Sequence, residues 1–335
     1  MMRALVTGAA GFIGGHVVRA LLDAGADVVA FDQAFAKRTP SRTMGVLDEV
    51  TELVPGDVLD PDSVARAVAG CDAVFHLAAV YSYARAEERA MRAINVRGVQ
   101  TVLEAASRGG ARRIIHTSTC ATCGPVPGRP ANERDVPPAR ELAIPYKRTK
   151  LEGERLVLAA ARGGADVVIV NPTVPVGPDD LRPTPTGKMV ADVAHGRARG
   201  YLAWSTLNIV AVQDVAIGHL RAFERGRTGE RYLLGGENLS IRDVFAAIAS
   251  TAGRPVPRIG VPWVAAYLAA RVADAAMRPI GREPSMLVLD EVRAGRIPHL
   301  FDDSKARSEL GYTSRPAEQA LAEATRAALA AKPHQ

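Results

Sequence analysis

Three glycines at a fixed spacing near the start of the chain constrain its fold more than any other feature. The stretch ALVTGAAGFIGGHVV, residues 4–18, sets Gly8, Gly11 and Gly14 between a short apolar run and an apolar helical pattern. Gly8 permits a tight turn after a strand, Gly11 leaves the backbone open to a pyrophosphate, and Gly14 lets the helix pack closely on the sheet. The free amides and the dipole at the helix start favour phosphate. The stretch therefore predicts a dinucleotide-binding strand–turn–helix.

Short apolar runs alternate with helical patterns through the first half of the chain. Apolar strands joined by crossover helices are typical of a parallel sheet that is covered on both faces. Right-handed crossovers then give an α/β fold with a doubly wound sheet of the Rossmann type. The predicted strands are 4–7, 27–31, 51–54, 73–77, 113–119 and 166–170, and the predicted helices are 12–24, 62–69, 87–106 and 146–161.

The pattern changes after the sixth predicted strand. Residues 172–187 are rich in proline and predict a loop, whereas the chain beyond residue 240 is mostly helical. We therefore expect a dinucleotide-binding domain over residues 1–171, to which residues 207–234 return with two further strands and a helix. A smaller, mostly helical lobe would bind the substrate over the carboxyl ends of the strands. This substrate-binding lobe is expected to comprise residues 172–206 and 235–335.

Composition narrows the classes of partner. The chain has 335 residues, of which 47% are apolar and 23% charged, and its net charge of +6 comes from scattered arginines. Because no run of like charges and no basic–aromatic stripe occurs, we expect a small-molecule substrate and no nucleic acid. The apolar stretch 261–270 is shorter than the roughly twenty residues of a membrane span, so it is predicted to pack on a core or to line an apolar pocket. We expect no membrane span and no signal peptide.

The three cysteines, Cys71, Cys120 and Cys123, are too few for a disulfide framework, which favours a cytoplasmic location. The last two form a C-x-x-C pair. Because no second pair of ligands accompanies them, no metal site is expected, and they are interpreted as small residues at the end of a buried strand.

An acidic residue, Asp32, ends the second predicted strand. A carboxylate at this place accepts hydrogen bonds from the adenosine ribose and repels the additional phosphate of NADP, so NAD is the favoured cofactor. NADP stays open as an alternative, because Lys37, Arg38 and Arg42 follow at once. Asp57, after the third strand, is expected either to meet the adenine edge or to begin a helix.

The segment IPYKRTK places Tyr146 and Lys150 one helical turn apart on the same face. A tyrosine has an ordinary pKa of about 10, and a nearby ammonium lowers that pKa. The phenol can then transfer a hydroxyl proton while a hydride moves. The preceding strand ends in HTSTCATCG, where Thr117, Ser118 and Thr119 offer a hydroxyl that would orient a substrate oxygen toward the tyrosine.

Together these motifs resemble the extended short-chain dehydrogenase/reductase family over nearly the whole chain. TGxxGxxG at 7–14, GDV at 56–58, HLAA at 76–79, Asn95 and NPT at 171–173 carry the resemblance. It implies that Thr119 is the catalytic hydroxyl beside Tyr146 and Lys150, with Ser118 as the second choice, that Lys150 holds the nicotinamide ribose, and that the protein is a homodimer. The implied cofactor-binding residues are Gly8, Gly11, Phe12, Ile13, Gly14, Asp32, Asp57, Val58, Leu77, Ala78, Ala79, Tyr146 and Lys150. The implied substrate-binding residues are Tyr81, Ser118, Asn171 and Thr173, with Tyr83 as a further candidate for the pocket wall.

Within the family, the stretches VNPTVPVGPDDLRPTPTGK and GERYLLGGENLSIRDVF are most similar to the hopanoid-associated sugar epimerase group, a near relative of the dihydroflavonol-reductase-like enzymes. Dehydratases of the family carry an Asp-Glu pair after the catalytic threonine, where this chain has Cys120 and Ala121. Nucleotide-sugar epimerases carry an arginine where this chain has Leu207, and a leucine cannot clamp a diphosphate. Both departures disfavour those activities.

We therefore expect an NAD-dependent oxidoreductase that acts at a secondary alcohol or ketone. The substrate is expected to be polar and sugar- or polyol-like, with any apolar part against Trp263 and Tyr267. Two alternatives stay open. One is an NAD-dependent sugar epimerase that works through a transient ketone, and the other is a non-catalytic protein that senses a dinucleotide.

Overall fold

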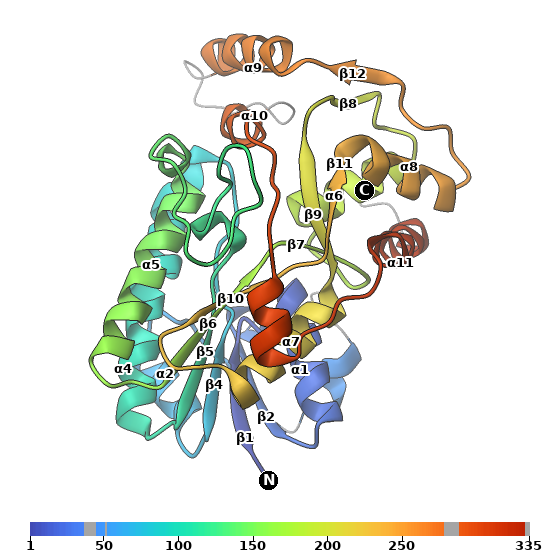
Figure 1. Ribbon diagram of the computed structural model, residues 1–335. Helices are drawn as coiled ribbons and strands as arrows, with labels where there is room; N and C mark the ends of the chain where they lie inside the picture. The colour runs from blue at the N-terminus through green and yellow to red at the C-terminus, as the bar shows by residue number, and fades with distance from the viewer. Residues whose placement is uncertain (37–44, 51, 278–287, 332–335) are drawn as a thin grey trace.

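Seven parallel strands form the main sheet of the computed structural model, which describes residues 1–36, 45–50, 52–277 and 288–331. Their order is β10-β6-β5-β4-β1-β2-β3, so the chain winds outward from β1 in both directions (Figure 1). The carboxyl ends of all these strands lie at one edge of the sheet. The predicted α/β, doubly wound fold is confirmed. The strands are β1 Arg3–Thr7, β2 Asp27–Asp32, β3 Glu52–Pro55, β4 Ala73–His76, β5 Arg113–Thr117, β6 Val167–Pro172 and β10 Arg231–Leu234.

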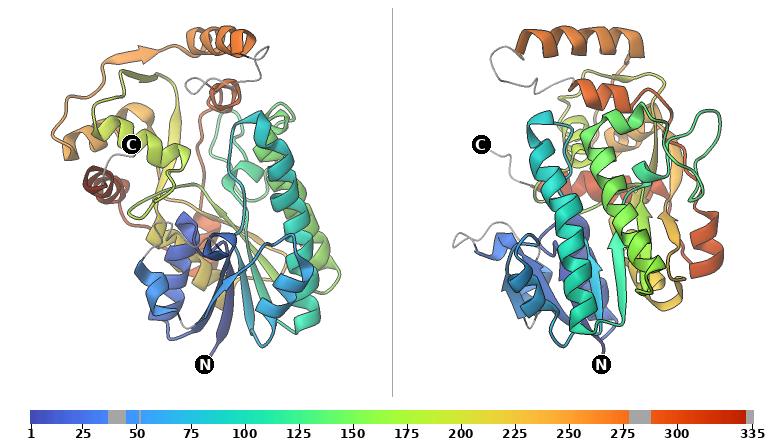
Figure 2. Two further views of the ribbon diagram at one scale, coloured as in Figure 1. Left: turned by 180° about the vertical axis from the view of Figure 1, so that it is seen from behind. Right: turned by 90° about the vertical axis from the view of Figure 1, so that its left-hand side faces the viewer.

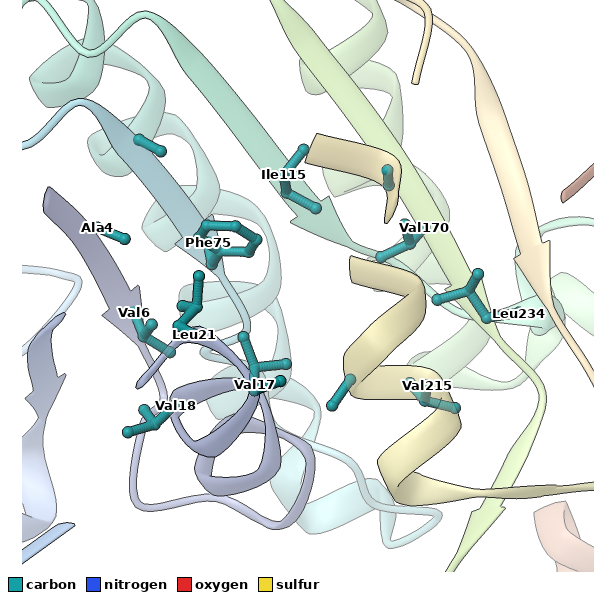
Figure 3. Close-up of a cluster of buried hydrophobic side chains, with 14 of the residues drawn as sticks. Ala4, Val6, Val17, Val18, Leu21, Phe75, Ile115, Val170, Val215 and Leu234 are labelled. Carbon is teal, nitrogen blue, oxygen red and sulfur yellow. The ribbon is translucent and has the colours of Figure 1, made fainter. Parts of the chain in front are cut away.

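Helices cover both faces of this sheet because alternate strand residues point to opposite sides. Ala4 and Val6 of β1 are buried against one group of helices, as the close-up of this core shows (Figure 3), whereas Leu5 is buried on the other face. The first group is α1 (Phe12–Asp23) and α7 (Val212–Arg225), with the short turns η1 (Gln33–Ala36), η2 (Gly45–Glu49) and η8 (Ala306–Leu310). The second group is α2 (Pro61–Val68), α4 (Val99–Gly109) and α5 (Pro145–Arg162).

A smaller lobe stands over the carboxyl ends of the strands (Figure 2). Its core lies between a three-stranded sheet, β11-β9-β7, and three helices. Beyond it, a two-stranded sheet and two helices form an outer layer. The strands are β7 Val174–Val176, β9 Thr206–Ala211, β11 Glu237–Ser240, β8 Gly200–Leu202 and β12 Ile259–Val261. The helices are α6 Pro185–Ala194, α8 Ile241–Thr251, α11 Ala317–Ala330, α9 Trp263–Met277 and α10 Leu289–Ala294.

The structure differs from the sequence-based expectations in the region around this lobe. Residues 207–234 divide between two sheets: α7 and β10 join the main sheet, whereas β9 pairs with β7 and β11, because Ile209 and Ala211 are buried against α8 and α11. The expected loop 172–187 contains β7. Its Pro175 is tolerated because β7 is an edge strand, where a missing N–H leaves no gap between strands.

The helix predicted over 87–106 is interrupted. The structure has α3 (Glu88–Arg92), a π-helical turn η4 (Ala93–Gly98) and then α4. The wider turn contains Asn95, whose buried side chain bonds both the amide nitrogen and the carbonyl oxygen of Val80, at 2.8 and 3.0 Å. The interruption therefore ties the helix to the segment that follows β4. No helix within the described residues is long and apolar enough to cross a membrane.

Candidate active site

The glycine loop has the shape that its spacing predicts. Gly8 has φ +73°, and a Cβ atom there would lie 2.7 Å from the backbone nitrogen of Ala78. A Cβ atom at Gly14 would lie 2.0 Å from the carbonyl oxygen of Gly8, so only glycine lets α1 approach the turn this closely. Gly11 caps α1 without a side-chain hydrogen bond, and the first turn carries no acidic side chain. The first amides of α1, at Phe12 and Ile13, are therefore suited to hold a pyrophosphate.

The segment after β4 runs beside this loop. The Leu77 amide donates to the carbonyl oxygen of Thr7 at 3.1 Å, and the Ala78 amide donates to the Thr7 hydroxyl at 3.4 Å. The adjacent strand ends thereby bring Leu77, Ala78 and Ala79 to the same edge of the sheet as the glycine loop. The glycine loop and the segment Leu77, Ala78 and Ala79, which were predicted to line one cofactor cleft, are therefore neighbours in the fold.

Asp32 lies next to the glycine loop at the end of β2. Its carboxylate accepts hydrogen bonds from the Ala10 amide at 3.1 Å and from the Ala34 amide at 2.8 Å. Asp57 closes a local turn by accepting from the Leu59 amide at 2.9 Å. The next residue, Val58, is buried in the core under the sheet, so its side chain faces away from the strand edge. Lys37, Arg38 and Arg42 lie outside the described residues.

Thr119 and Tyr146 meet above the carboxyl end of β5. Thr119 precedes the short turn η5 (Cys120–Thr122), and Tyr146 is the second residue of α5, directly after Pro145, which is a favourable first residue for a helix. The Thr119 side chain lies beside the Tyr146 hydroxyl. Burial raises the pKa of Tyr146 above its ordinary value, and the neighbouring Thr119 hydroxyl opposes this shift only in part. The phenol is therefore protonated at neutral pH.

Lys150 lies one turn farther along α5. Its side chain is buried, and Nζ donates to the carbonyl oxygen of Thr117 at 2.8 Å. Burial lowers the pKa of Lys150 to about 8. That this ammonium lowers the pKa of Tyr146 when a dinucleotide is bound stays a prediction; in the structure, desolvation of the phenol is the largest influence on that pKa and raises it.

A buried polar network supports the turn that carries Thr119. Asn171 is fully buried, and its Nδ2 donates to the Thr119 carbonyl oxygen at 3.1 Å and to the Thr122 hydroxyl at 2.9 Å. Glu154 accepts from the same Nδ2 at 3.0 Å and forms an ion pair with Arg231 at 3.0 Å. The sequence analysis missed Glu154 and Arg231, because no local motif links residues so far apart along the chain.

Three residues expected to bind substrate turn inward. Asn171 belongs to the network above. The Ser118 hydroxyl lies 3.4 Å from that of Thr122, and the Thr173 hydroxyl donates to the Leu234 carbonyl oxygen at 3.5 Å. Their side chains therefore hold the backbone of the site rather than facing its open side.

Tyrosine rings form the open side of the site. The ring centroid of Tyr81 lies 4.5 Å from that of Tyr146 and 5.7 Å from that of Tyr83, and Tyr81 is 41% exposed. The centroids of Tyr83 and Tyr146 are 6.4 Å apart. We name these three rings the tyrosine wall. The wall places the faces and edges of three mutually inclined aromatic rings beside the reacting hydroxyls.

The short helix α10 is fixed against the tyrosine wall. Arg85, in the turn η3 (Arg85–Glu87), forms two hydrogen bonds to the buried carboxylate of Asp290, at 3.0 and 3.1 Å. The negative charge of the next residue, Glu291, raises the pKa values of both Tyr81 and Tyr83, although burial is the larger cause in each case. Arg85 and Asp290 are 205 positions apart, so the sequence carried no signal for this contact.

Trp263 and Tyr267 pack against α10. Their rings are stacked at 4.7 Å, and Trp263 Nε1 donates to the Val292 carbonyl oxygen at 2.9 Å. Together with Ala266 and Ala270 they attach α9 to α10. The apolar stretch 261–270 was predicted either to pack one helix face on a core or to line an apolar pocket. In the structure, one face of its helix packs on a core.

A cavity of about 490 Å³ lies between the start of α1 and the smaller lobe. Phe12, Gly177, Lys188 and Arg197 contribute to its lining, as do alanines of α11. Neither Thr119 nor Tyr146 lines it. The cavity therefore lies beside the glycine loop rather than beside the hydroxyl pair.

The C-x-x-C pair lies in the turn under the site. Both cysteines are free and buried, and burial raises the pKa of Cys120 to about 12. Within the described part of the chain, no group of three or more His, Cys, Asp or Glu side chains is arranged to hold a metal ion.

Comparisons with known proteins agree with this geometry. The sequence model described as "NAD dependent epimerase/dehydratase family" matches residues 4–235. A putative dihydroflavonol 4-reductase of Synechocystis sp. is 36% identical over 324 residues, which cover 95% of this chain and 92% of that protein. Sterol demethylase protein B of Methylococcus capsulatus is 33% identical over 331 residues, which cover 96% of this chain and 97% of that protein. The crystal structure of gox2253 superposes with a TM-score of 0.83 at 36% identity and covers 97% of both chains.

Proposed function

The chain belongs to the NAD-dependent epimerase/dehydratase family, and from that premise we propose that this enzyme transfers a hydride between NAD and a secondary alcohol or ketone. The observation that carries the proposal is that the Tyr146 and Thr119 side chains lie side by side, at the sheet edge where the glycine loop lies. A carbinol or carbonyl oxygen that replaces this contact would be held by both hydroxyls at once.

The protonation state of Tyr146 favours the reductive direction. A bound dinucleotide would supply the hydride to the carbonyl carbon. Because its pKa is raised, Tyr146 is a phenol at neutral pH and can donate its proton to the carbonyl oxygen, which becomes the alcohol. Thr119 orients the same oxygen. Lys150, held by the Thr117 carbonyl oxygen, keeps a positive charge below the developing phenolate.

The substrate that we propose has an apolar body with a single reacting oxygen. The aromatic rings of the tyrosine wall offer apolar contacts to a ring or chain beside the site. Leu207, which stands where a diphosphate-binding arginine would be needed, pairs with Leu239 across β9 and β11 and packs in the core of the smaller lobe. The names of two relatives, a dihydroflavonol 4-reductase and a sterol demethylase protein, refer to ring compounds of this kind. A polar, sugar-like substrate is the alternative, and a substrate panel distinguishes the two.

The cofactor that we propose is NAD. The residues present fit it, since the amides at the start of α1 are uncapped and the Asp32 carboxylate lies beside the glycine loop. We also propose that the protein is a homodimer. Light scattering coupled to size-exclusion chromatography tests this directly.

The experiment is a substrate panel with NADH and NADPH, followed by absorbance of the reduced nicotinamide. We expect net oxidation of NADH with ketones on alkyl or fused-ring bodies, and no epimerisation of a nucleotide sugar by chromatography. Epimerisation without net change in absorbance would overturn the proposal in favour of the sugar epimerase. Binding of NADH with no turnover of any ketone, alcohol or sugar would favour the sensing protein.

A further inference from the structure

The outer face of α9 exposes a row of large apolar side chains. Val264, Leu268 and Val272 are 61%, 58% and 70% exposed, and their spacing of four residues puts them on one side of the helix. Ile259, in the neighbouring strand β12, is 62% exposed. Ten large apolar residues are exposed in the described part of the chain, and four of them fall in this one segment. We name these four residues the apolar row.

The apolar row is not part of the packing that holds α9. At 100° per residue, the two fully buried residues of the helix, Ala266 and Ala270, lie opposite the row. They face α10, as do Trp263 and Tyr267. Two views show α9 at the end of the molecule far from the N-terminus, outside all the other elements of the lobe (Figures 1 and 2). Within the chain, therefore, nothing described covers the row.

Exposed arginines accompany the row along the chain, and Arg271 donates from Nη1 to the Tyr267 hydroxyl at 3.4 Å. Arg271 shares the outer face of α9, and Arg254 and Arg258 lie exposed in the segment that leads into β12. None of the three takes part in the ion pairs found among the described residues. Asp274, the one acidic residue of α9, falls on the side of the helix that carries Tyr267 and is half-buried. The exposed face is therefore apolar in its centre and cationic at its margin.

We propose that β12 and α9 dock this enzyme on the surface of an anionic lipid bilayer. The helix would lie in the plane of the surface, with Val264, Leu268 and Val272 among the upper acyl chains and the arginines among the phosphate groups. Long arginine side chains can reach the headgroups while their aliphatic stems stay on the apolar side. The fifteen-residue helix lies on such a surface and does not span it.

The charges favour a lipid surface over a second copy of this chain. A two-fold contact through the apolar row would bring Arg271 of each copy against the same cationic face of the other. Like charges held together in a desolvated contact oppose association. An anionic bilayer offers acyl chains to the apolar row and negatively charged headgroups to the arginines.

Docking at α9 also connects to the catalytic side of the molecule. Trp263 binds α9 to α10 through the Val292 carbonyl oxygen, and α10 is held against the tyrosine wall by Arg85 and Asp290. A substrate with an apolar body would thus leave the bilayer close to the reacting hydroxyls. This link to catalysis rests on the proposed function, whereas the docking itself does not.

The test is flotation of the purified full chain with two kinds of vesicle, without any substrate. One vesicle is phosphatidylcholine alone, and the other is an equal mixture of phosphatidylcholine and phosphatidylglycerol. The test variant carries Val264→Ser, Leu268→Ser and Val272→Ser. The control variant carries Val136→Ser, Ile217→Ser and Leu329→Ser, which remove three exposed apolar side chains elsewhere. A third variant carries Arg254→Gln, Arg258→Gln and Arg271→Gln.

We expect the parent chain to bind the anionic vesicles and to release at high salt. The serine variant of the row should bind about tenfold more weakly or worse, and each lost arginine should weaken binding roughly fivefold. The control variant should bind like the parent. Three results would each overturn the proposal: no binding of the parent, equal binding by the row variant, or equal loss in the control. If the parent binds no vesicle and light scattering finds a dimer that the row variant loses, the face joins two copies instead. Circular dichroism establishes that all variants are folded.

Discussion

The hydroxyl of Tyr146 lies beside the side chain of Thr119, although the two residues lie on different elements. The first prediction follows from this contact. Tyr146→Phe removes the proton donor and should lower kcat by about 10²–10⁴-fold while the affinity for NADH stays within about twofold. Steady-state kinetics and fluorescence titration of NADH measure the two effects.

The matched control for this substitution is Tyr201→Phe. Tyr201 packs against Phe245 in the smaller lobe, at a centroid distance of 6.0 Å, and takes no part in the site. Its variant should keep parental kcat. A Tyr146→Phe enzyme that turns over at the parental rate would refute the assigned proton donor.

The pKa of Lys150 predicts how activity depends on pH. Burial lowers that pKa from 10.5 to about 8, so Lys150 loses its positive charge as the pH rises through about 8. Tyr146 stays protonated over this range because its pKa is raised. We therefore expect kcat/KM for ketone reduction to fall above about pH 8. In Lys150→Arg, the guanidinium stays charged, and the decline should disappear even if the maximal rate is lower.

The free energy of unfolding should rise with pH over the interval in which activity falls. Below pH 8, Lys150 is protonated in both states. Between about pH 8 and 10.5 the unfolded chain binds this proton and the folded chain does not, so the contribution of Lys150 to the free energy of unfolding rises with pH, by about 1 kcal/mol per unit. Urea titrations at several pH values measure the contribution as the difference between the parent and Lys150→Met. Loss of activity that coincides with unfolding would contradict this explanation.

Asp32 is predicted to determine the choice of dinucleotide. Asp32→Ala removes the acceptor for ribose hydroxyls and the charge that repels a phosphate, so kcat/KM with NADH should fall by about tenfold or more, and that with NADPH should rise. Asp32→Asn is the matched variant, because it keeps an acceptor for the Ala10 amide while it removes the charge. Unchanged selectivity in both variants would assign selectivity to other residues.

Gly14→Ala tests the close approach of α1 to the glycine loop. The added Cβ would lie 2.0 Å from the Gly8 carbonyl oxygen, so the loop must shift. We expect a loss of about 1–3 kcal/mol in the free energy of unfolding and of roughly tenfold or more in NADH affinity. Gly45→Ala is the control, since nothing lies within 4 Å of its added Cβ. Parental NADH binding by Gly14→Ala would argue against the pyrophosphate site.

The ion pair between Arg85 and Asp290 should affect substrate binding more than chemistry. Asp290→Asn keeps the shape but weakens three charge-assisted hydrogen bonds, two from Arg85 and one from Arg293, at a cost of about 1–3 kcal/mol. We expect KM for the ketone to rise while kcat stays near the parental value, because α10 lies beside Tyr81 and Tyr83 and carries neither of the reacting hydroxyls, Tyr146 and Thr119. The control is Glu224→Gln, whose pair with Arg221 is exposed and should contribute under about 1 kcal/mol. A fall in kcat at constant KM would contradict this role.

Local patterns were sufficient to predict much of the fold. Three features depend on residues that are close together in the sequence, so their spacing is visible there. They are the glycine loop, the alternation of strands and helices, and the Tyr146–Lys150 pair. The strand pairing of β9 was not predictable in this way. Its partners β7 and β11 come from opposite sides of it along the chain.

Three predicted substrate-binding residues have partners that the sequence did not show. The family resemblance implied that Asn171, Ser118 and Thr173 bind substrate, and this stays a prediction. In the structure their side chains bond Glu154, Thr122 and Leu234, and those partners depend on tertiary contacts. The pKa of Tyr146 has the same origin. A sequence shows the neighbouring ammonium but not the desolvation that outweighs it.

The network under Thr119 also bears on how the enzyme is made. Arg231 donates to the Thr122 carbonyl oxygen and pairs with Glu154, yet it follows Thr122 by 109 positions. The glycine loop, Thr119, Tyr146 and Lys150 are synthesised before β10. The strand whose Arg231 supports the turn under Thr119 is therefore not yet present when the reacting groups have been made. Nascent chains that stop before β10 should therefore carry every reacting group and remain inert, so catalytic competence arrives late in synthesis.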